Sequence, residues 1–219
     1  MALRTGHYEL IAREGLPFII PLFLAALFLW SLDYSQLSLV FLLVSFAVAC
    51  FFRNPERTPP EIEGVVLSPA DGVVKEIVRP TQSENLEGDG LQRISIFMSI
   101  FNVHVNRCPI SGAVQKVSHV PGAFLDARDN RASQSNERNS IVVVGDDRTI
   151  EVVQVAGMIA RRIACWVGPG DKVKQGDRFG LIRFGSRLDV YVPGNLSVSV
   201  ETGDKVRAGV TVIAQNQKA

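Results

Sequence analysis

Residues 170–177 read GDKVKQGD, and residues 203–210 read GDKVRAGV. The two phrases begin 33 residues apart and repeat a glycine, an aspartate, a valine and a second glycine in the same places. Glycine and aspartate favour tight turns, and valine favours strands. The repetition therefore predicts two equivalent β units joined by the segment between them.

The repeated phrase resembles the barrel-sandwich hammerhead of biotinyl and lipoyl carriers, in which a hairpin projects between two paired half-motifs. In those carriers the hairpin presents the modified lysine four residues beyond the last apolar residue of the first half. Counting four from Ile182 reaches Ser186, and residues 179–190 contain no lysine. The missing lysine excludes carrier chemistry, while the resemblance still predicts an exposed hairpin tip at Ser186.

The dipeptide Gly185-Ser186 lies in RFGSRLDVYVP, residues 183–193. A serine at a turn is usually a turn residue only. Here the glycine removes bulk from the preceding carbonyl and tolerates strained backbone angles, while strand-like flanks would hold the turn rigid. The serine hydroxyl could therefore attack its own backbone and leave the chain with an electrophile of its own making.

From residue 64 onward, short β-branched runs alternate with turn residues, a spacing typical of a compact antiparallel β domain. Residues 157–167 could form a strand or a short helix. The polar segment 122–140 is long for a connection and is either disordered or a functional loop. Residues 83–90 read as a plain hairpin loop. We predict a mainly β fold with barrel-sandwich-like repeats.

Two uncharged runs, residues 16–30 and 36–52, precede the β domain. Neither run has the polar stripe of a soluble helix, and the second run argues against a signal peptide. Fifteen helical residues rise only about 22 Å, less than the roughly 30 Å of a hydrocarbon core. A hairpin of two short spans and a pair that dips into one leaflet both remain open.

These runs divide the chain into a cytoplasmic segment 1–15, a membrane-embedded helical hairpin 16–53, a Pro-rich linker 54–63 and a β-rich catalytic domain 64–219. Basic flanks favour the cytoplasmic side for both ends of the hairpin. The flanking residues are Arg4, Arg13, Arg53 and Arg57, whereas the break between the runs carries Asp33. We expect the β domain to face the cytosol at the cytoplasmic membrane.

Composition excludes several function classes. With 23 basic and 22 acidic residues, the chain has no basic footprint for nucleic acid. Its three cysteines are widely spaced, without a CxxC pair or a Cys/His cluster, so we expect neither a disulfide framework nor a metal site. Without a dinucleotide or P-loop motif, unusual chemistry needs another source.

His104 and Asp71 are the candidates to assist Ser186. In IFNVHVNR, strand alternation puts Asn102, His104 and Asn106 on one polar face, although a structural histidine is the plain alternative. Asp71 lies in SPADG, a plausible turn. It could instead orient His104, as the acid does in a Ser-His-Asp arrangement.

SPADG, IFNVHVNRCPISG and FGSRLDVYVP, behind an N-terminal apolar pair, resemble the short phosphatidylserine decarboxylase proenzymes over residues 50–213. The resemblance implies self-cleavage between Gly185 and Ser186, conversion of Ser186 to a pyruvoyl cofactor, and decarboxylation of phosphatidylserine to phosphatidylethanolamine. It assigns the processing base to His104 and the supporting acid to Asp71. NERN, residues 136–139, also resembles a family segment, which makes the polar loop a candidate wall of the site.

The expected partners are a phospholipid substrate, the membrane, and the large and small chains of one precursor; a homo-oligomer is left open. Asn106, Arg107 and Arg138 are candidate substrate-binding residues, the two arginines for the lipid phosphate. Two departures stand out. The chain reads Phe184-Gly185-Ser186-Arg187 where many members read Leu-Gly-Ser-Thr, and Phe101 replaces a second histidine of the longer members, which leaves the proton donor open.

Two rival functions remain. A pyruvoyl decarboxylase of a soluble amino acid would not need the apolar runs. A membrane-anchored barrel-sandwich adaptor without catalysis would explain the anchor and the repeats, but not Gly185-Ser186 together with His104 and Asp71.

Overall fold

The computed structural model describes residues 9–86, 90–123, 135–157, 162–183 and 186–217. Residues 7–56 form one compact unit, and the chain from residue 57 onward belongs to another. The division falls inside the expected linker 54–63. Gly185 lies outside the described residues, as does much of the polar segment 122–140.

The first unit is a helical hairpin. A short 3-10 turn η1 (Arg13–Gly15) leads into α1 (Leu16–Ser31), and α2 (Ser35–Phe51) follows. The serines of α2 bind the first helix: Ser38 Oγ donates to the Ala26 carbonyl at 2.7 Å, and Ser45 Oγ to the Ile19 carbonyl at 3.2 Å. With these polar groups turned inward, large apolar side chains of both helices remain exposed. The expected pair of apolar helices is confirmed.

By length and composition, the helix over Arg13–Ser31 could cross a membrane, with 19 residues and a mean hydropathy of 1.7. The second helix is shorter, at 17 residues.

The second unit is antiparallel β, as the strand-like runs predict. Its central sheet has eight strands in the order β13-β2-β3-β11-β7-β6-β5-β9, and two three-stranded sheets have the orders β1-β14-β12 and β4-β10-β8. The strands are β1 (Val65–Leu67), β2 (Gly72–Thr81), β3 (Leu91–Met98), β4 (Val105–Arg107), β5 (Gly112–Val120), β6 (Arg138–Val144), β7 (Thr149–Ala156), β8 (Ile163–Cys165), β9 (Lys172–Val173), β10 (Arg178–Ile182), β11 (Ser186–Val192), β12 (Leu196–Val198), β13 (Lys205–Val206) and β14 (Val212–Asn216).

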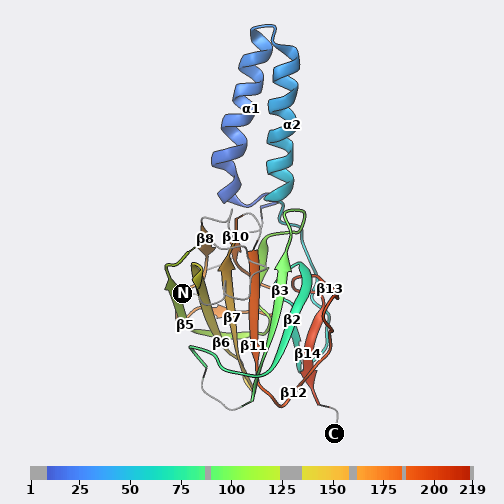
Figure 1. Ribbon diagram of the computed structural model, residues 1–219, viewed down its shortest axis with the longest axis vertical. Helices are drawn as coiled ribbons and strands as arrows, with labels where there is room; N and C mark the ends of the chain where they lie inside the picture. The colour runs from blue at the N-terminus through green and yellow to red at the C-terminus, as the bar shows by residue number, and fades with distance from the viewer. Residues whose placement is uncertain (1–8, 87–89, 124–134, 158–161, 184–185, 218–219) are drawn as a thin grey trace. The chain divides into compact units, whose positions relative to one another are not determined.

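Strand β11 lies near the middle of the large sheet, between β3 and β7 (Figure 1). It is antiparallel to both neighbours, so the start of β11 lies beside the ends of β3 and β7. Its inward side chains, Leu188, Val190 and Val192, belong to one continuous apolar core. This core fixes which side chains of β11 face inward.

The two glycine-aspartate repeats adopt the same local structure. In each, the aspartate carboxylate accepts a hydrogen bond from the backbone N–H three residues earlier. Asp171 accepts from Gly168 and Asp204 accepts from Glu201, both at 2.8 Å. The repeats have positive φ angles at four equivalent glycines: 91° at Gly170, 102° at Gly203, 84° at Gly176 and 69° at Gly209. The equivalence predicted from the sequence is confirmed.

Each glycine-aspartate repeat pairs with the start of another strand, and the equivalence of these two partner segments is not apparent from the sequence. Strand β13 pairs with the start of β2, and β9 pairs with the start of β5. Both partner strands begin at a glycine whose added Cβ would lie 2.2 Å from a carbonyl oxygen, that of Phe97 for Gly72 and that of Val144 for Gly112. SPADG and PISG are therefore equivalent turns, and Gly72 is required by close backbone packing.

Candidate active site at the start of the central strand

Ser186 is the first residue of β11, and it is fully buried. It pairs with Met98 of β3 on one side and with Ala156 of β7 on the other. Its Oγ lies 3.7 Å from the Met98 sulfur. The expectation of an exposed hairpin tip is therefore wrong. Strand β10 pairs with β4 and β8 rather than with β11, so the two strands that flank Gly185 belong to different sheets.

His104 is buried immediately before β4, with 1% of its surface exposed. Its Nδ1 lies 2.9 Å from the Asn102 carbonyl oxygen. Because a carbonyl can only accept a hydrogen bond, Nδ1 carries the proton and the lone pair of a neutral ring is on Nε2. The backbone thus fixes the tautomer that a general base requires.

A closed turn formed by residues 99–102 connects Met98, the strand partner of Ser186, to the His104 segment. Both the backbone N–H and the hydroxyl of Ser99 donate to Asn102 Oδ1 at 2.8 Å, and the Asn102 N–H donates to the Ser99 carbonyl at 2.9 Å. These bonds fix the carbonyl that orients His104. The turn therefore couples the end of β3, next to Ser186, to the position of the histidine ring.

A chain of buried amides leads toward Ser186. Asn139 Nδ2 donates to Gln154 Oε1 at 2.9 Å, and Gln154 Nε2 donates to Asn106 Oδ1 at 2.8 Å. Asn106 Nδ2 then points at the Met98 sulfur, at 3.8 Å, which is the atom that contacts Ser186 Oγ. Because each amide fixes the direction of the next, the chain turns an N–H donor toward the Ser186 end of the sheet.

The described contacts of Asp71 are with Arg57 and Ala208 rather than with His104. Arg57 reaches both carboxylate oxygens, at 2.5 and 2.7 Å, and the Ala208 N–H donates to the same carboxylate at 2.8 Å. The Arg107 N–H donates to the Pro69 carbonyl, which holds the SPADG loop against β4, the strand that follows His104. The structure thus brings Asp71 to the same region, and its action on His104 stays a prediction.

Only one of the three candidate substrate-binding residues lies beside Ser186. That residue is Asn106, whose side-chain amide lies 3.8 Å from the Met98 sulfur, the atom that also contacts Ser186 Oγ. Arg107 is buried against the repeats and donates to the Gly176 carbonyl at 2.9 Å. Arg138 bonds Glu84 at 2.8 Å, and strand alternation places it on the face of β6 opposite Asn139. Neither arginine shows a described contact that would direct it to the serine.

The described end of the polar loop packs next to the serine's strand partner. Asn136 is fully buried, and its Nδ2 donates to the Ala156 carbonyl at 2.7 Å. The Ala156 N–H in turn donates to the Glu137 carbonyl at 3.0 Å. These bonds place the start of NERN beside the residue that pairs with Ser186.

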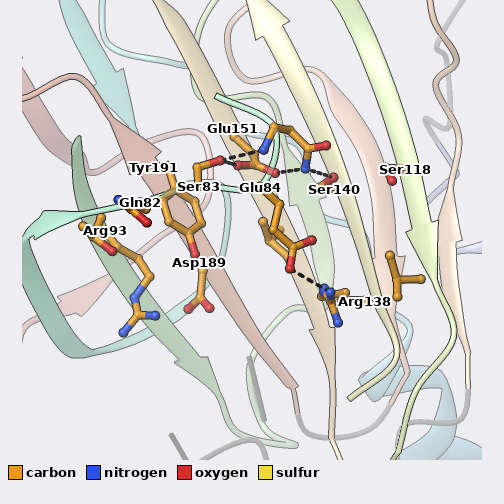
Figure 2. A pocket seen from close by; sticks show the side chains of 14 residues that line it. Gln82, Ser83, Glu84, Arg93, Ser118, Arg138, Ser140, Glu151, Asp189 and Tyr191 are labelled. Atoms are coloured by element: carbon orange, nitrogen blue, oxygen red, sulfur yellow. Dashed lines mark hydrogen bonds and ion pairs between the residues drawn. The ribbon is translucent and has the colours of Figure 1, made fainter. Parts of the chain in front are cut away.

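A polar cavity of 420 Å³ lies on the opposite face of the large sheet. Figure 2 shows Asp189 and Tyr191 of β11 among its lining residues, together with the Ser83–Glu151 and Glu84–Arg138 contacts of the 83–90 loop. Burial, reinforced by the Asp189 carboxylate, raises the pKa of Tyr191. Because Asp189 and Tyr191 alternate with Ser186 along the strand, this cavity is separate from the serine site.

The two cysteines of the β domain, Cys108 and Cys165, supply no competing nucleophile. Burial raises the pKa of both Cys108 and Cys165, so these thiols stay protonated at neutral pH. Within the described ranges, no group of three His, Cys, Asp or Glu side chains could hold a metal ion.

The fold and the site define a class of protein, an antiparallel β domain in which barrel-sandwich repeats flank a buried serine. The family model described as phosphatidylserine decarboxylase matches residues 45–214. The chain belongs to the phosphatidylserine decarboxylase family.

Three relatives named phosphatidylserine decarboxylase proenzyme illustrate the similarity. The protein of Syntrophus aciditrophicus is 48% identical over 205 residues, covering 93% of this chain and 96% of its own. The Desulfotalea psychrophila protein is 45% identical, covering 94% and 96%, and the Geobacter metallireducens protein is 48% identical, covering 93% and 95%.

The contact between Arg57 and Asp71 generates a test of how Asp71 acts. Arg57→Met and Asp71→Asn each remove half of a buried pair, and each should lower the free energy of unfolding by about 3 kcal/mol. If Asp71 acts by holding the SPADG loop, both variants slow self-cleavage by the same factor, measured as chain separation on gels over time. Loss of cleavage in Asp71→Asn alone would instead show direct action on His104. Glu76→Gln, which breaks a more exposed pair with Arg93, is the control.

Proposed function

We propose that this chain decarboxylates phosphatidylserine to phosphatidylethanolamine after it cuts itself between Gly185 and Ser186. The observation that carries the proposal is the burial of the Ser186 side chain at the start of a central strand, where the His104 turn and the Asn106 amide converge on Met98. A plain turn serine would be exposed. Family membership and the name proenzyme carried by the relatives support the same reading.

Self-cleavage begins with an acyl shift. His104 Nε2 takes the Ser186 hydroxyl proton, and Oγ attacks the Gly185 carbonyl carbon. The bond between that carbon and the Ser186 nitrogen breaks as the nitrogen receives a proton from His104. The peptide bond becomes an ester, and the serine nitrogen becomes a free amine.

An elimination completes the cut. Loss of the Ser186 α-proton expels the Gly185 carboxylate and leaves dehydroalanine, and water then releases ammonia and leaves a ketone. The products are a chain of 185 residues and, from the remainder of the 219, a chain of 34 residues that starts with a pyruvoyl group.

Asn106 has a role in this scheme that differs from substrate binding alone. Attack on the Gly185 carbonyl develops negative charge on its oxygen, and a preorganised donor at that oxygen lowers the barrier. The amide chain from Asn139 through Gln154 orients Asn106 Nδ2 toward Met98, next to Ser186. We assign the stabilising N–H to Asn106.

The residues around Ser186 fit a pyruvoyl group. The group needs no more room than the buried serine, and Met98 and Ala156 flank it. Once formed, it supplies a carbonyl that takes up the substrate amine and accepts the electrons released as carbon dioxide leaves. Phe101 has no proton to give, so we assign to His104 Nε2 the delivery of the proton that replaces the lost carboxylate. Because Nε2 carries only a lone pair in the neutral ring, it first takes up this proton from water.

The two chains of the precursor should remain together after cleavage. Strand β11 belongs to the small chain and pairs along its length with β3 and β7 of the large chain. Its side chains are also part of the common core. The small chain therefore stays bound without a covalent link.

We assign the helical hairpin to the cytoplasmic membrane, with the β domain on the cytosolic side. The apolar helix over Arg13–Ser31 and the basic flanks of the hairpin support this assignment. Arg57 no longer counts among those flanks, because it is buried against Asp71. Arg4, Arg13 and Arg53 carry the argument.

His104 and Ser186 are tested by substitution. Ser186→Ala should stay one 24.0 kDa chain because no nucleophile remains. His104→Gln should slow cleavage at least a hundredfold by removing the base, and gels of freshly purified protein report both outcomes. His119→Gln is the matched control, since His119 is half exposed and bonds Glu137. Normal processing of His104→Gln would remove His104 from the role of base.

The substrate is tested with the processed full-length chain in phosphatidylcholine vesicles. Phosphatidylserine in the same bilayer should yield phosphatidylethanolamine and carbon dioxide, while free serine and other soluble amino acids should yield none. Activity on a soluble amino acid alone would favour that rival. An uncut chain with no activity on either substrate would favour the adaptor.

A further inference from the structure

The turn between β3 and β4 exposes two large apolar side chains. Ile100 is 50% exposed and Phe101 is 81% exposed. Among the described residues from 57 onward, the other exposed large apolar side chains are Ile62 and Val73. Val73 pairs with Phe97, which directly precedes Met98. Three of these four exposed apolar side chains, Val73, Ile100 and Phe101, therefore lie toward the Ser186 end of β3.

The turn of residues 99–102, here called the tip, is held closed by hydrogen bonds. Asn102 Oδ1 accepts two bonds from Ser99, and the Asn102 N–H returns one to the Ser99 carbonyl, so the turn is closed beneath Ile100 and Phe101. Such a turn cannot readily fold these side chains back into the core. Water is a poor solvent for a phenylalanine held in this way, and contiguous exposed apolar groups mark interaction sites.

Basic residues lie at the same end of the domain. Arg162 and Arg183 flank the paired ends of β8 and β10, where the Arg183 N–H donates to the Arg162 carbonyl at 3.3 Å. Leu181 of β10, two residues before Arg183, pairs with Val105 of β4, the residue that follows His104. An apolar tip beside cations has the composition of a surface that binds anionic phospholipid.

We propose that the turn formed by residues 99–102 inserts Ile100 and Phe101 into an anionic phospholipid bilayer while Arg162 and Arg183 face the lipid headgroups. The choice of a bilayer as partner rests on the proposed phospholipid substrate. Because Met98 pairs with Ser186 and directly precedes the turn, insertion brings the headgroup layer to the serine site. The same turn orients His104, so lipid docking and the base share one structural element.

A kinetic comparison tests the tip in the full-length chain, reconstituted in phosphatidylcholine vesicles. Substrate is supplied either as long-chain phosphatidylserine in the bilayer or as monomeric short-chain phosphatidylserine in solution. The ratio of kcat/KM for the bilayer substrate to that for the monomer should fall about tenfold in Ile100→Ser/Phe101→Ser. Ile62→Ser, with a side chain 54% exposed, should leave the ratio within twofold. An unchanged ratio in the double variant, or an equal loss on both substrates, overturns the proposal.

Depth in the bilayer is measured without catalysis. Phe101→Trp should gain tryptophan fluorescence that brominated phospholipids quench, relative to the parent chain with Trp30 and Trp166. Asn195→Trp, in the turn at the opposite end of β11, should gain fluorescence that these lipids do not quench. Equal quenching of both variants overturns the proposal. Quenching specific to Phe101→Trp in a chain without decarboxylase activity would uphold the tip and refute the proposed function.

Discussion

The site depends on the register of β11 between β3 and β7. This register places Ser186 opposite Met98 and Ala156, and places Leu188, Val190 and Val192 in the core. A shift of one residue would turn the serine to the other face of the sheet and bring Asp189 inward. The apolar core therefore fixes the position of Ser186, and the proposed nucleophile needs no exposed loop.

Burial of Ser186 also suits the proposed chemistry. An acyl shift followed by elimination would compete with hydrolysis in an exposed hairpin, whereas water reaches a buried strand end less easily. The groups proposed to assist the serine are themselves buried and fixed: the Asn102 carbonyl orients His104, and two amides in series, those of Asn139 and Gln154, orient Asn106. The apolar tip of the same turn then links this interior site to its lipid.

The sequence predicted the fold class and the paired repeats because glycine turns and β-branched runs are local signals. It also singled out Gly185-Ser186 and His104 as site residues, and these roles stay predictions. It misjudged the position of Ser186, because nothing local shows that β10 and β11 enter different sheets. It could not reveal that Asp71 binds Arg57, 14 residues earlier in the chain. The alternation in IFNVHVNR did signal the polar face that became the Asn106 amide chain, but its partners Gln154 and Asn139 lie far away in sequence.

The central claim is that Ser186 becomes the electrophile of the enzyme. Intact-mass measurement of the purified, denatured chain tests it most directly. The account predicts a 185-residue chain and a 34-residue chain that is lighter by one ammonia than the same chain starting with serine. An intact 24.0 kDa chain, or a small chain that starts with an unmodified serine, would contradict it.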